Sequence, residues 1–268
     1  MKRTITVLSV ISVIIVGLFL ANQAQLLAKP SDIMSTANHL YETGQYSQAA
    51  QAYQQLVDQG FTESALFYNL GNAYYKAGDY GRAIANYRRA QLLAPRDADI
   101  AANLNLARSQ VVGQLPEDTP ADAVSEGWFS ALGHWSQQWF TTNELALLAL
   151  GAWVLFVFLL ILLGNLPQGR AMREGLQYAL GVTVLVLAIG GAILGSRLHV
   201  ENSQPEAVVV GQEVKVTSGP GTQYVTEFTL PNGAEVRLLE NRGNWARLEM
   251  AGNTLQGWVP DSAVEAIN

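Results

Sequence analysis

Two long runs without a charged residue constrain this chain more than any other feature of its sequence. They cover residues 145–163 and 176–196, which are 19 and 21 residues long. A helix needs about 20 apolar residues to cross the hydrocarbon core of a bilayer, so each run is predicted to be a transmembrane helix. The alternative is a buried hairpin in a soluble domain, which would need an apolar shell that a chain of 268 residues can hardly supply.

The distribution of Lys and Arg predicts the orientation of this hairpin. Its connection, residues 164–175, carries Arg170 and Arg173, whereas residues 113–144 contain no Lys or Arg. Short connections rich in these cations stay in the cytoplasm. Residues 164–175 are therefore predicted to be a cytoplasmic loop. The parts before and after the hairpin are both predicted to be extracytoplasmic, in the periplasm if the membrane is a bacterial inner (cytoplasmic) membrane.

The N-terminal segment, residues 1–28, has the layout of a secretory signal. Lys2 and Arg3 precede an apolar run from Ile5 to Leu20. Small residues follow the run without a clean cleavage pattern. A cleaved signal peptide and an uncleaved signal anchor therefore both remain open.

Residues 31–110 contain an internal repeat. A shift of 34 residues places Gly44 on Gly78 and Tyr53 on Tyr87. This is the tetratricopeptide (TPR) period, and the second copy resembles that family closely. The matching positions are Phe67, Leu70, Gly71, Tyr74, Ala83, Tyr87, Ala90 and Pro95. The segment is predicted to be an α-helical solenoid of two repeats, closed by a capping helix that begins after Asp97.

The resemblance to tetratricopeptide proteins implies a groove lined by the first helix of each repeat. The candidate partner-binding residues on that face are Asn38, Tyr41, Tyr68, Asn72, Tyr75 and Lys76. Asn38 and Asn72 are one period apart, where this family uses asparagine to hold the backbone of a bound peptide. The alternative is that these are solvated groove residues without a ligand.

Residues 111–143 form a linker with an unusually aromatic helical face. Trp128, Trp135 and Trp139 recur at helical spacing. Tryptophan concentrates at the headgroup level, so these three residues are predicted to lie at the membrane interface, on a helix that precedes the first span. Packing of the same face against the repeats is the alternative.

Residues 205–268 change to short β-rich runs separated by Gly-, Pro- and Asn-containing turns, which indicates an all-β domain. The order "VKVTSGPGTQY", "LPNGAEV", "GNWARLE" and "GWVP" resembles the bacterial SH3-like barrel. Trp245 and Trp258 are candidate contact residues or core aromatics of that barrel. Glu235, Glu240 and Glu249 are expected on its solvated face.

Several functional classes are not expected. The formal charge of −6 and the lack of a basic run argue against nucleic-acid binding. The chain has no cysteine, and its three histidines are isolated, so no metal site is predicted. No phosphate-binding loop, zinc-protease pair or nucleophile elbow occurs, and the chain is expected to be non-catalytic and to need no cofactor.

The fold class predicted is a multi-domain membrane protein with a TPR solenoid, a two-helix transmembrane hairpin and an SH3-like barrel. That order of parts resembles the BatE-type proteins of the Bacteroides aerotolerance operon, as do "EFTLPNGAEV" and "GWVPDSAVEAI" locally. The resemblance implies a scaffold in an envelope-stress complex, beside von Willebrand factor A-type Bat membrane proteins and a MoxR-type AAA+ ATPase. The alternative function is an envelope sensor or anchor whose SH3-like domain binds peptidoglycan peptide.

Overall fold

The computed structural model describes residues 29–111, 132, 135–165, 169–203, 205–250 and 255–267. The predicted signal segment and Trp128 lie outside these ranges. Contacts divide the chain into two compact units, one ending at Phe61 and the other beginning at Thr62. The two units are described separately below.

The first unit contains a pair of packed helices, α2 (Pro30–Glu42) and α3 (Tyr46–Asp58). Proline at the first position of α2 costs no hydrogen bond, because the first amide groups of a helix have no partner within it. Gly44 forms the turn with a positive φ of 80°, which glycine adopts without strain. These two helices correspond to the first predicted repeat.

The second repeat consists of α4 (Ser64–Ala77) and α5 (Tyr80–Leu93), and α6 (Ala98–Ser109) follows it. Gly78 ends α4 in the left-handed conformation, and Asp79 accepts a hydrogen bond from the third amide group of α5. Gly71 lies against the ring of Tyr87 where the helices cross, so a larger side chain at this position would collide with that ring.

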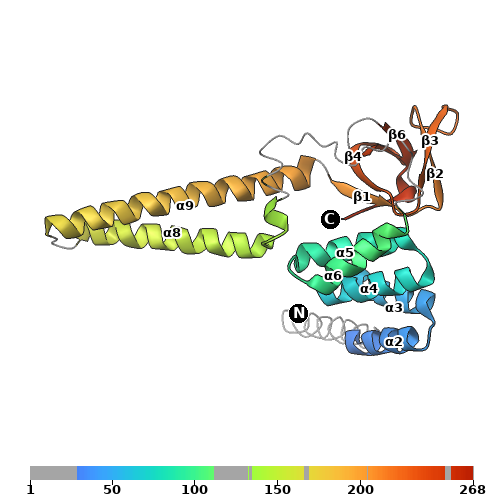
Figure 1. Ribbon diagram of the computed structural model, residues 1–268, viewed down its shortest axis with the longest axis horizontal. Coiled ribbons are helices and arrows are strands. Elements are labelled where there is room, and N and C mark those ends of the chain that lie inside the picture. Colours follow the sequence, from blue (N-terminus) through green and yellow to red (C-terminus); the bar gives the residue numbers. More distant parts are fainter. Residues whose placement is uncertain are drawn as a thin grey trace, which may run out of the picture. The chain divides into compact units, whose positions relative to one another are not determined.

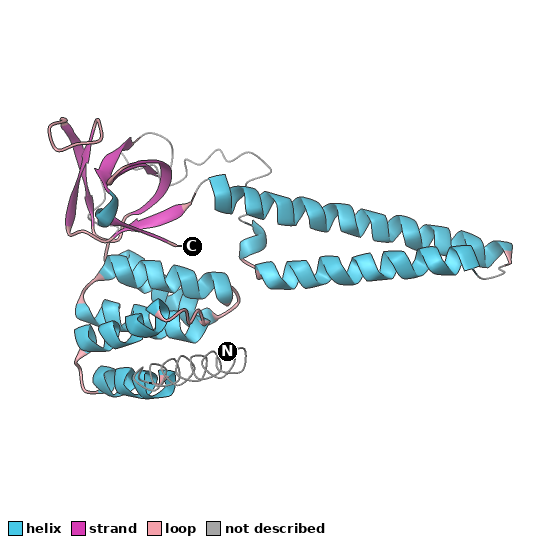
Figure 2. Ribbon diagram, turned by 180° about the vertical axis from the view of Figure 1, so that it is seen from behind, coloured by secondary structure: helices cyan, strands magenta, loops and turns pink. Residues whose placement is uncertain are grey.

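Two long helices, α8 (Thr142–Asn165) and α9 (Arg170–Ser203), run side by side as a hairpin (Figures 1 and 2). By length and composition, residues Thr142–Asn165 and Ala171–Leu198 could each cross a membrane. Both helices extend beyond the apolar runs, because flanking polar residues continue the helical backbone. Most of the segment predicted as a loop is therefore helical: α8 ends at Asn165 and α9 begins at Arg170.

The C-terminal part is a seven-stranded antiparallel sheet with the order β3-β2-β6-β5-β4-β1-β7. The strands are β1 (Glu206–Val209), β2 (Glu213–Thr217), β3 (Thr226–Pro231), β4 (Glu235–Arg242), β5 (Trp245–Met250), β6 (Gln256–Pro260) and β7 (Val264–Ala266), with a short 3₁₀ helix, η2 (Asp261–Ala263), before the last. The predicted all-β domain is therefore confirmed at the level of an antiparallel sheet.

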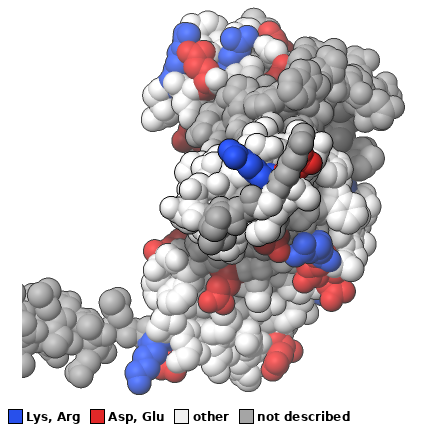
Figure 3. Space-filling view, turned by 90° about the vertical axis from the view of Figure 1, so that its left-hand side faces the viewer, with Lys and Arg blue, Asp and Glu red and all other residues white. Residues whose placement is uncertain are grey.

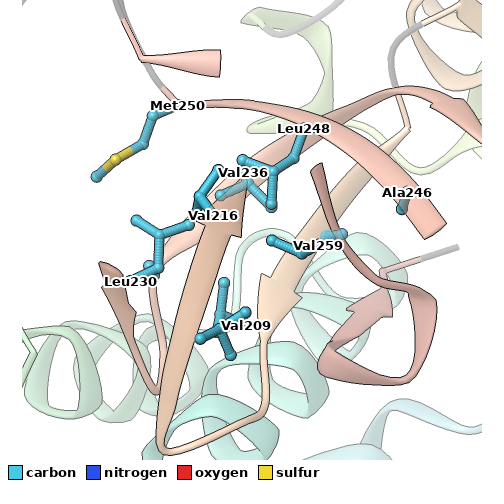
Figure 4. Close-up of a cluster of buried hydrophobic side chains, with 11 residues drawn as sticks. Val209, Val216, Leu230, Val236, Ala246, Leu248, Met250 and Val259 are labelled. Carbon is cyan, nitrogen blue, oxygen red and sulfur yellow. The ribbon is translucent and has the colours of Figure 1, made fainter. Parts of the chain in front are cut away.

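The predicted barrel closure is not seen in the described residues, where β3 and β7 remain as the two edges of the sheet. Register shifts in β2 and β4 disturb the pairing locally, and such bulges bend a strand without joining the sheet edges. A compact core fills the curved sheet (Figure 4). Its buried members include Val209, Val216, Leu230, Val236, Leu248 and Val259.

A second buried cluster belongs to both helices and strands. It contains Ile84 and Tyr87 of α5, Leu104 of α6, Val208 of β1 and Ile267 beyond β7. The core of the second repeat therefore continues into β1 and the residue that follows β7, although these parts are far from the repeat in sequence.

Candidate functional site

A polar network joins α4, α5 and α6 at the predicted groove residues of the second repeat. The Tyr87 hydroxyl donates to Asn72 Oδ1 over 2.7 Å. Asn103 Nδ2 donates to the same oxygen over 3.0 Å and to the Tyr68 hydroxyl over 2.9 Å. The structure therefore brings the predicted residues Tyr68 and Asn72 together, and it adds Asn103, which the sequence interpretation missed.

The first unit repeats part of this arrangement one period earlier. The Tyr53 hydroxyl donates to Asn38 Oδ1 over 2.6 Å. The spacing from asparagine to tyrosine is 15 residues in both repeats. Burial, followed by the negative electrostatic influence of Tyr41 and Glu42, raises the pKa of Tyr53, which keeps its hydroxyl proton available for the bond.

The other predicted groove residues lie in different surroundings. Tyr41 is half-buried, with its ring centroid 5.4 Å from that of Tyr46. Tyr75 is half-buried beside Tyr80, at 5.6 Å between centroids, and Lys76 is exposed. Their binding role stays a prediction.

The network determines what Asn72 can offer a ligand. Its carbonyl oxygen already accepts two hydrogen bonds, from Tyr87 and Asn103. Its amide NH₂ group is the remaining polar end, and it can donate to the carbonyl oxygen of an extended peptide. Two bonds at the oxygen orient that donor in advance, which lowers the ordering cost of binding.

A separate polar pocket of about 470 Å³ lies on the sheet. Its lining comprises Ser218, Gly219, Pro220, Tyr224, Glu227, Arg242, Arg247, Gln256, Gly257 and Trp258. Trp258 is only 7% exposed, and the guanidinium of Arg242 lies 5.3 Å from the centre of its ring. Trp258 is therefore a mostly buried wall of this pocket, and the Arg242 guanidinium covers the face of its ring.

Trp245 lies at the start of β5, opposite Pro260 in β6, and it is absent from the described lining of that pocket. The two predicted tryptophans therefore do not form one site. The expectation of a solvated acidic face is wrong for two of its three members. Glu235 binds Arg108, and Glu249 is buried and accepts a hydrogen bond from Gln256.

The aromatic segment before α8 is described only in part. Trp135 and Trp139 are 50% and 54% exposed, in keeping with either a lipid or a water contact. Arg96, which follows α5, donates to the Trp139 carbonyl oxygen over 3.0 Å and pairs with Glu144 over 2.6 Å. The start of α8 is thereby tied to the second repeat.

The described residues contain no cluster of His, Asp or Glu that could hold a metal ion. On the face shown in Figure 3, Lys and Arg side chains lie in small groups near acidic side chains, without an extended basic patch. The surface shown therefore offers small mixed-charge sites.

Residues 64–97 match the family model of the tetratricopeptide repeat. These residues include α4 and α5 and end at Asp97, the N-cap of α6. No curated protein matches the chain. Tetratricopeptide repeats are protein-interaction units, so the match indicates a scaffold for protein partners in general.

Proposed function

We propose that this chain is a non-catalytic, membrane-anchored scaffold that binds an extended segment of a partner protein through the inner face of its second helical repeat. The observation that carries the proposal is the pre-oriented amide of Asn72 in the matched tetratricopeptide unit, held by Tyr87 of that unit and by Asn103 of α6. An amide fixed in this way supplies the donor that backbone recognition needs.

Membrane anchoring rests on the composition of α8 and α9. Both helices are long and apolar enough to span, and many of their large apolar side chains are exposed, as lipid contact requires. The Arg173 side chain near the connection and the absence of Lys and Arg from residues 113–144 support a cytoplasmic connection. Both soluble parts are then extracytoplasmic.

The finer assignment is a BatE-type factor in an aerotolerance or envelope-stress complex of a bacterial inner membrane. The C-terminal sheet is then an open variant of the SH3-like fold, and the partner is a von Willebrand factor A-type membrane protein. A MoxR-type ATPase acts indirectly, on the cytoplasmic side. The order of repeat, apolar hairpin and antiparallel sheet supports this assignment.

The substitution Asn72→Asp tests the binding face in the full chain. Aspartate keeps an oxygen that accepts from Tyr87 and Asn103 but replaces the donor group by a second acceptor. Capture of a co-expressed von Willebrand factor A-type membrane protein in detergent should weaken about tenfold, the equivalent of about 1.4 kcal/mol for one lost hydrogen bond.

Tyr87→Phe is the matched control, because it removes the internal bond and leaves the asparagine donor in place. This variant should lose about 1 kcal/mol of stability and weaken capture less than Asn72→Asp does, because the donor remains and Asn103 still holds the asparagine oxygen. Undiminished capture by Asn72→Asp would remove the proposed role of the inner face. Absence of capture by the unmodified chain would remove the aerotolerance assignment.

The pocket beside Trp258 supports a second candidate function, an envelope sensor or anchor that binds peptidoglycan peptide. Its volume of about 470 Å³ and its mixture of Arg242, Arg247 and Glu227 suit a short zwitterionic peptide. Cosedimentation of the detergent-solubilised chain with purified peptidoglycan distinguishes the two functions. The sensor predicts pelleting that Arg247→Ala abolishes, whereas the scaffold predicts none.

A further inference from the structure

The face of α5 that carries Ile84 makes a buried apolar contact with the sheet. Ile84 and Val111 share one buried cluster with Val208 and Ile267. The turn between β3 and β4 approaches the same surface. A Cβ added to Gly233 would lie 2.6 Å from Val111 Cγ2 and 3.2 Å from Ile84 Cδ1. Helices and sheet therefore pack here at the density of a protein interior.

Three arginines of the helices surround this apolar contact, and each pairs with a carboxylate of the sheet. The pairs are Arg88 with Glu206, Arg89 with Glu265 and Arg108 with Glu235. Arg108 donates from Nε over 2.5 Å and from Nη2 over 2.8 Å, one bond to each oxygen of Glu235. This bidentate geometry specifies orientation as well as attraction.

The pKa of Arg108 agrees with a charged pair. Burial of the guanidinium lowers its pKa, and the hydrogen bonds and the negative charge of Glu235 raise it by more, so the balance lies above the ordinary value. The group therefore stays protonated in the interface, and it would be costly to leave without its carboxylate.

The sheet also caps α5. The amide of Gly81, in the first turn of the helix, donates to Asn232 Oδ1, while Asp79 accepts from the next amide, that of Arg82. Asn232 Nδ2 in turn donates to the Val210 carbonyl oxygen over 2.9 Å. One of the unpaired amide groups at the helix start is thus satisfied by a residue 151 positions away.

Gly81 shows that the helix sequence is adapted to the sheet. A Cβ at this position would collide with the carbonyl oxygen of Val209. Within a helix, glycine is less favourable than alanine, and Gly81 has no positive φ that would require it. The close approach of β1 accounts for a glycine that α5 alone does not need.

We infer that the surface formed by Gly81, Ile84, Arg88, Arg89, Arg108 and Val111, here called the α5 docking face, is an interaction surface whose resident partner is the C-terminal sheet of the same chain. The second repeat and the sheet then form one structural unit, although the helical hairpin lies between them in the sequence. An external partner must use other surfaces, because the sheet occupies this one. The inference is independent of which protein the scaffold recruits.

Chemical cross-linking tests the contact in the full chain, in detergent or nanodiscs. The chain has no native cysteine, so Arg89→Cys with Glu265→Cys creates a unique pair for a short bis-maleimide. The two substitutions remove the Arg89–Glu265 pair and the longer Arg82–Glu265 pair, and they leave the Arg88–Glu206 and Arg108–Glu235 pairs intact. Rapid intramolecular cross-linking at high dilution is expected, and its absence would overturn the inference.

Gly81→Ala in this double-cysteine background gives a sharper test. Alanine favours the helix but cannot coexist with the docked carbonyl oxygen of Val209. The rate of cross-linking should fall about tenfold while the helical circular dichroism is retained. Leu93→Ala, at an exposed position on the same helix, should leave the rate unchanged. An unchanged rate with Gly81→Ala would contradict the docking.

A charge exchange controls for loss of folding. Arg108→Glu should slow cross-linking by a similar factor, because it opposes Glu206 and Glu235 with a third carboxylate. Addition of Glu235→Arg should restore most of the rate, which a misfolded protein could not do. Failure of the exchange to restore it, with the fold intact, would contradict the pairing. The control Lys215→Glu, at an exposed position in β2, should have no effect.

Discussion

Asparagine and tyrosine are coupled at a fixed distance along the chain in both repeats. Alignment of the repeats predicted the equivalence of Tyr53 and Tyr87. The resemblance to tetratricopeptide proteins made Asn38 and Asn72 candidates for holding a bound peptide, with solvated groove residues as the alternative. In the structure, the oxygen of each asparagine accepts a bond from the tyrosine of its own repeat. The oxygen of Asn72 accepts a second bond from Asn103, which leaves its NH₂ end for the proposed recognition, a detail that the sequence could not specify.

Gly71→Ala should destabilise the second repeat by about 1–3 kcal/mol. The added Cβ would lie 2.8 Å from Cδ1 and Cε1 of Tyr87. Gly71 belongs to α4 and Tyr87 to α5, and these helices are packed against each other, so neither residue can easily move away. Chemical denaturation of the full chain measures the loss. In a Tyr87→Ala background the ring is gone, so the same substitution should cost nothing further. An equal cost in both backgrounds would show that the Tyr87 ring is not the cause.

Tyr53 should titrate above the ordinary pKa of tyrosine, which is about 10. Burial and nearby negative groups disfavour the phenolate in the folded state. A raised pKa contributes stability that is present below the unfolded-state pKa and is lost as the pH rises through the folded-state value. The difference in ultraviolet absorbance between the unmodified chain and Tyr53→Phe measures this titration, and a midpoint at or below 10 would contradict the cause given.

Individual helices and strands were predictable where one local pattern determines each. The 34-residue period and the resemblance to tetratricopeptide repeats predicted the repeat helices, and charge-free runs predicted α8 and α9. The lengths of α8 and α9 were not predictable. An apolar run indicates only the part of a helix that could contact lipid, and both helices continue into the polar residues on either side of their runs. Barrel closure was expected by resemblance, and no local pattern decides whether β3 and β7 meet.

The sheet should depend on its core and not on its outer apolar residues. Leu248→Ala removes a completely buried side chain of β5 and should cost about 2–5 kcal/mol. Leu239→Ala, at a position in β4 that is 42% exposed, is the matched control and should cost much less. Thermal unfolding of the two variants compares them directly. Equal losses would contradict the core described for the sheet.

The whole molecule depends on pairings that the sequence could not reveal. The arginines of α5 and α6 meet carboxylates 118 to 176 residues away. The chain contains many acidic residues that could pair with each arginine, and no periodicity or spacing in the sequence identifies the right one. Glu235 was expected to be solvated for that reason. Asn103 was missed similarly, because its partners lie on another helix.

The central claim is that the helical hairpin returns the chain to the side of the membrane from which it came. Single cysteines at Ser47 and Asn241, both exposed, and at Gly169 in the connection allow a direct measurement with a membrane-impermeant maleimide on intact spheroplasts. We predict labelling of Ser47→Cys and Asn241→Cys before lysis and of Gly169→Cys only after it. Protection of either of the first two positions until lysis would contradict the account.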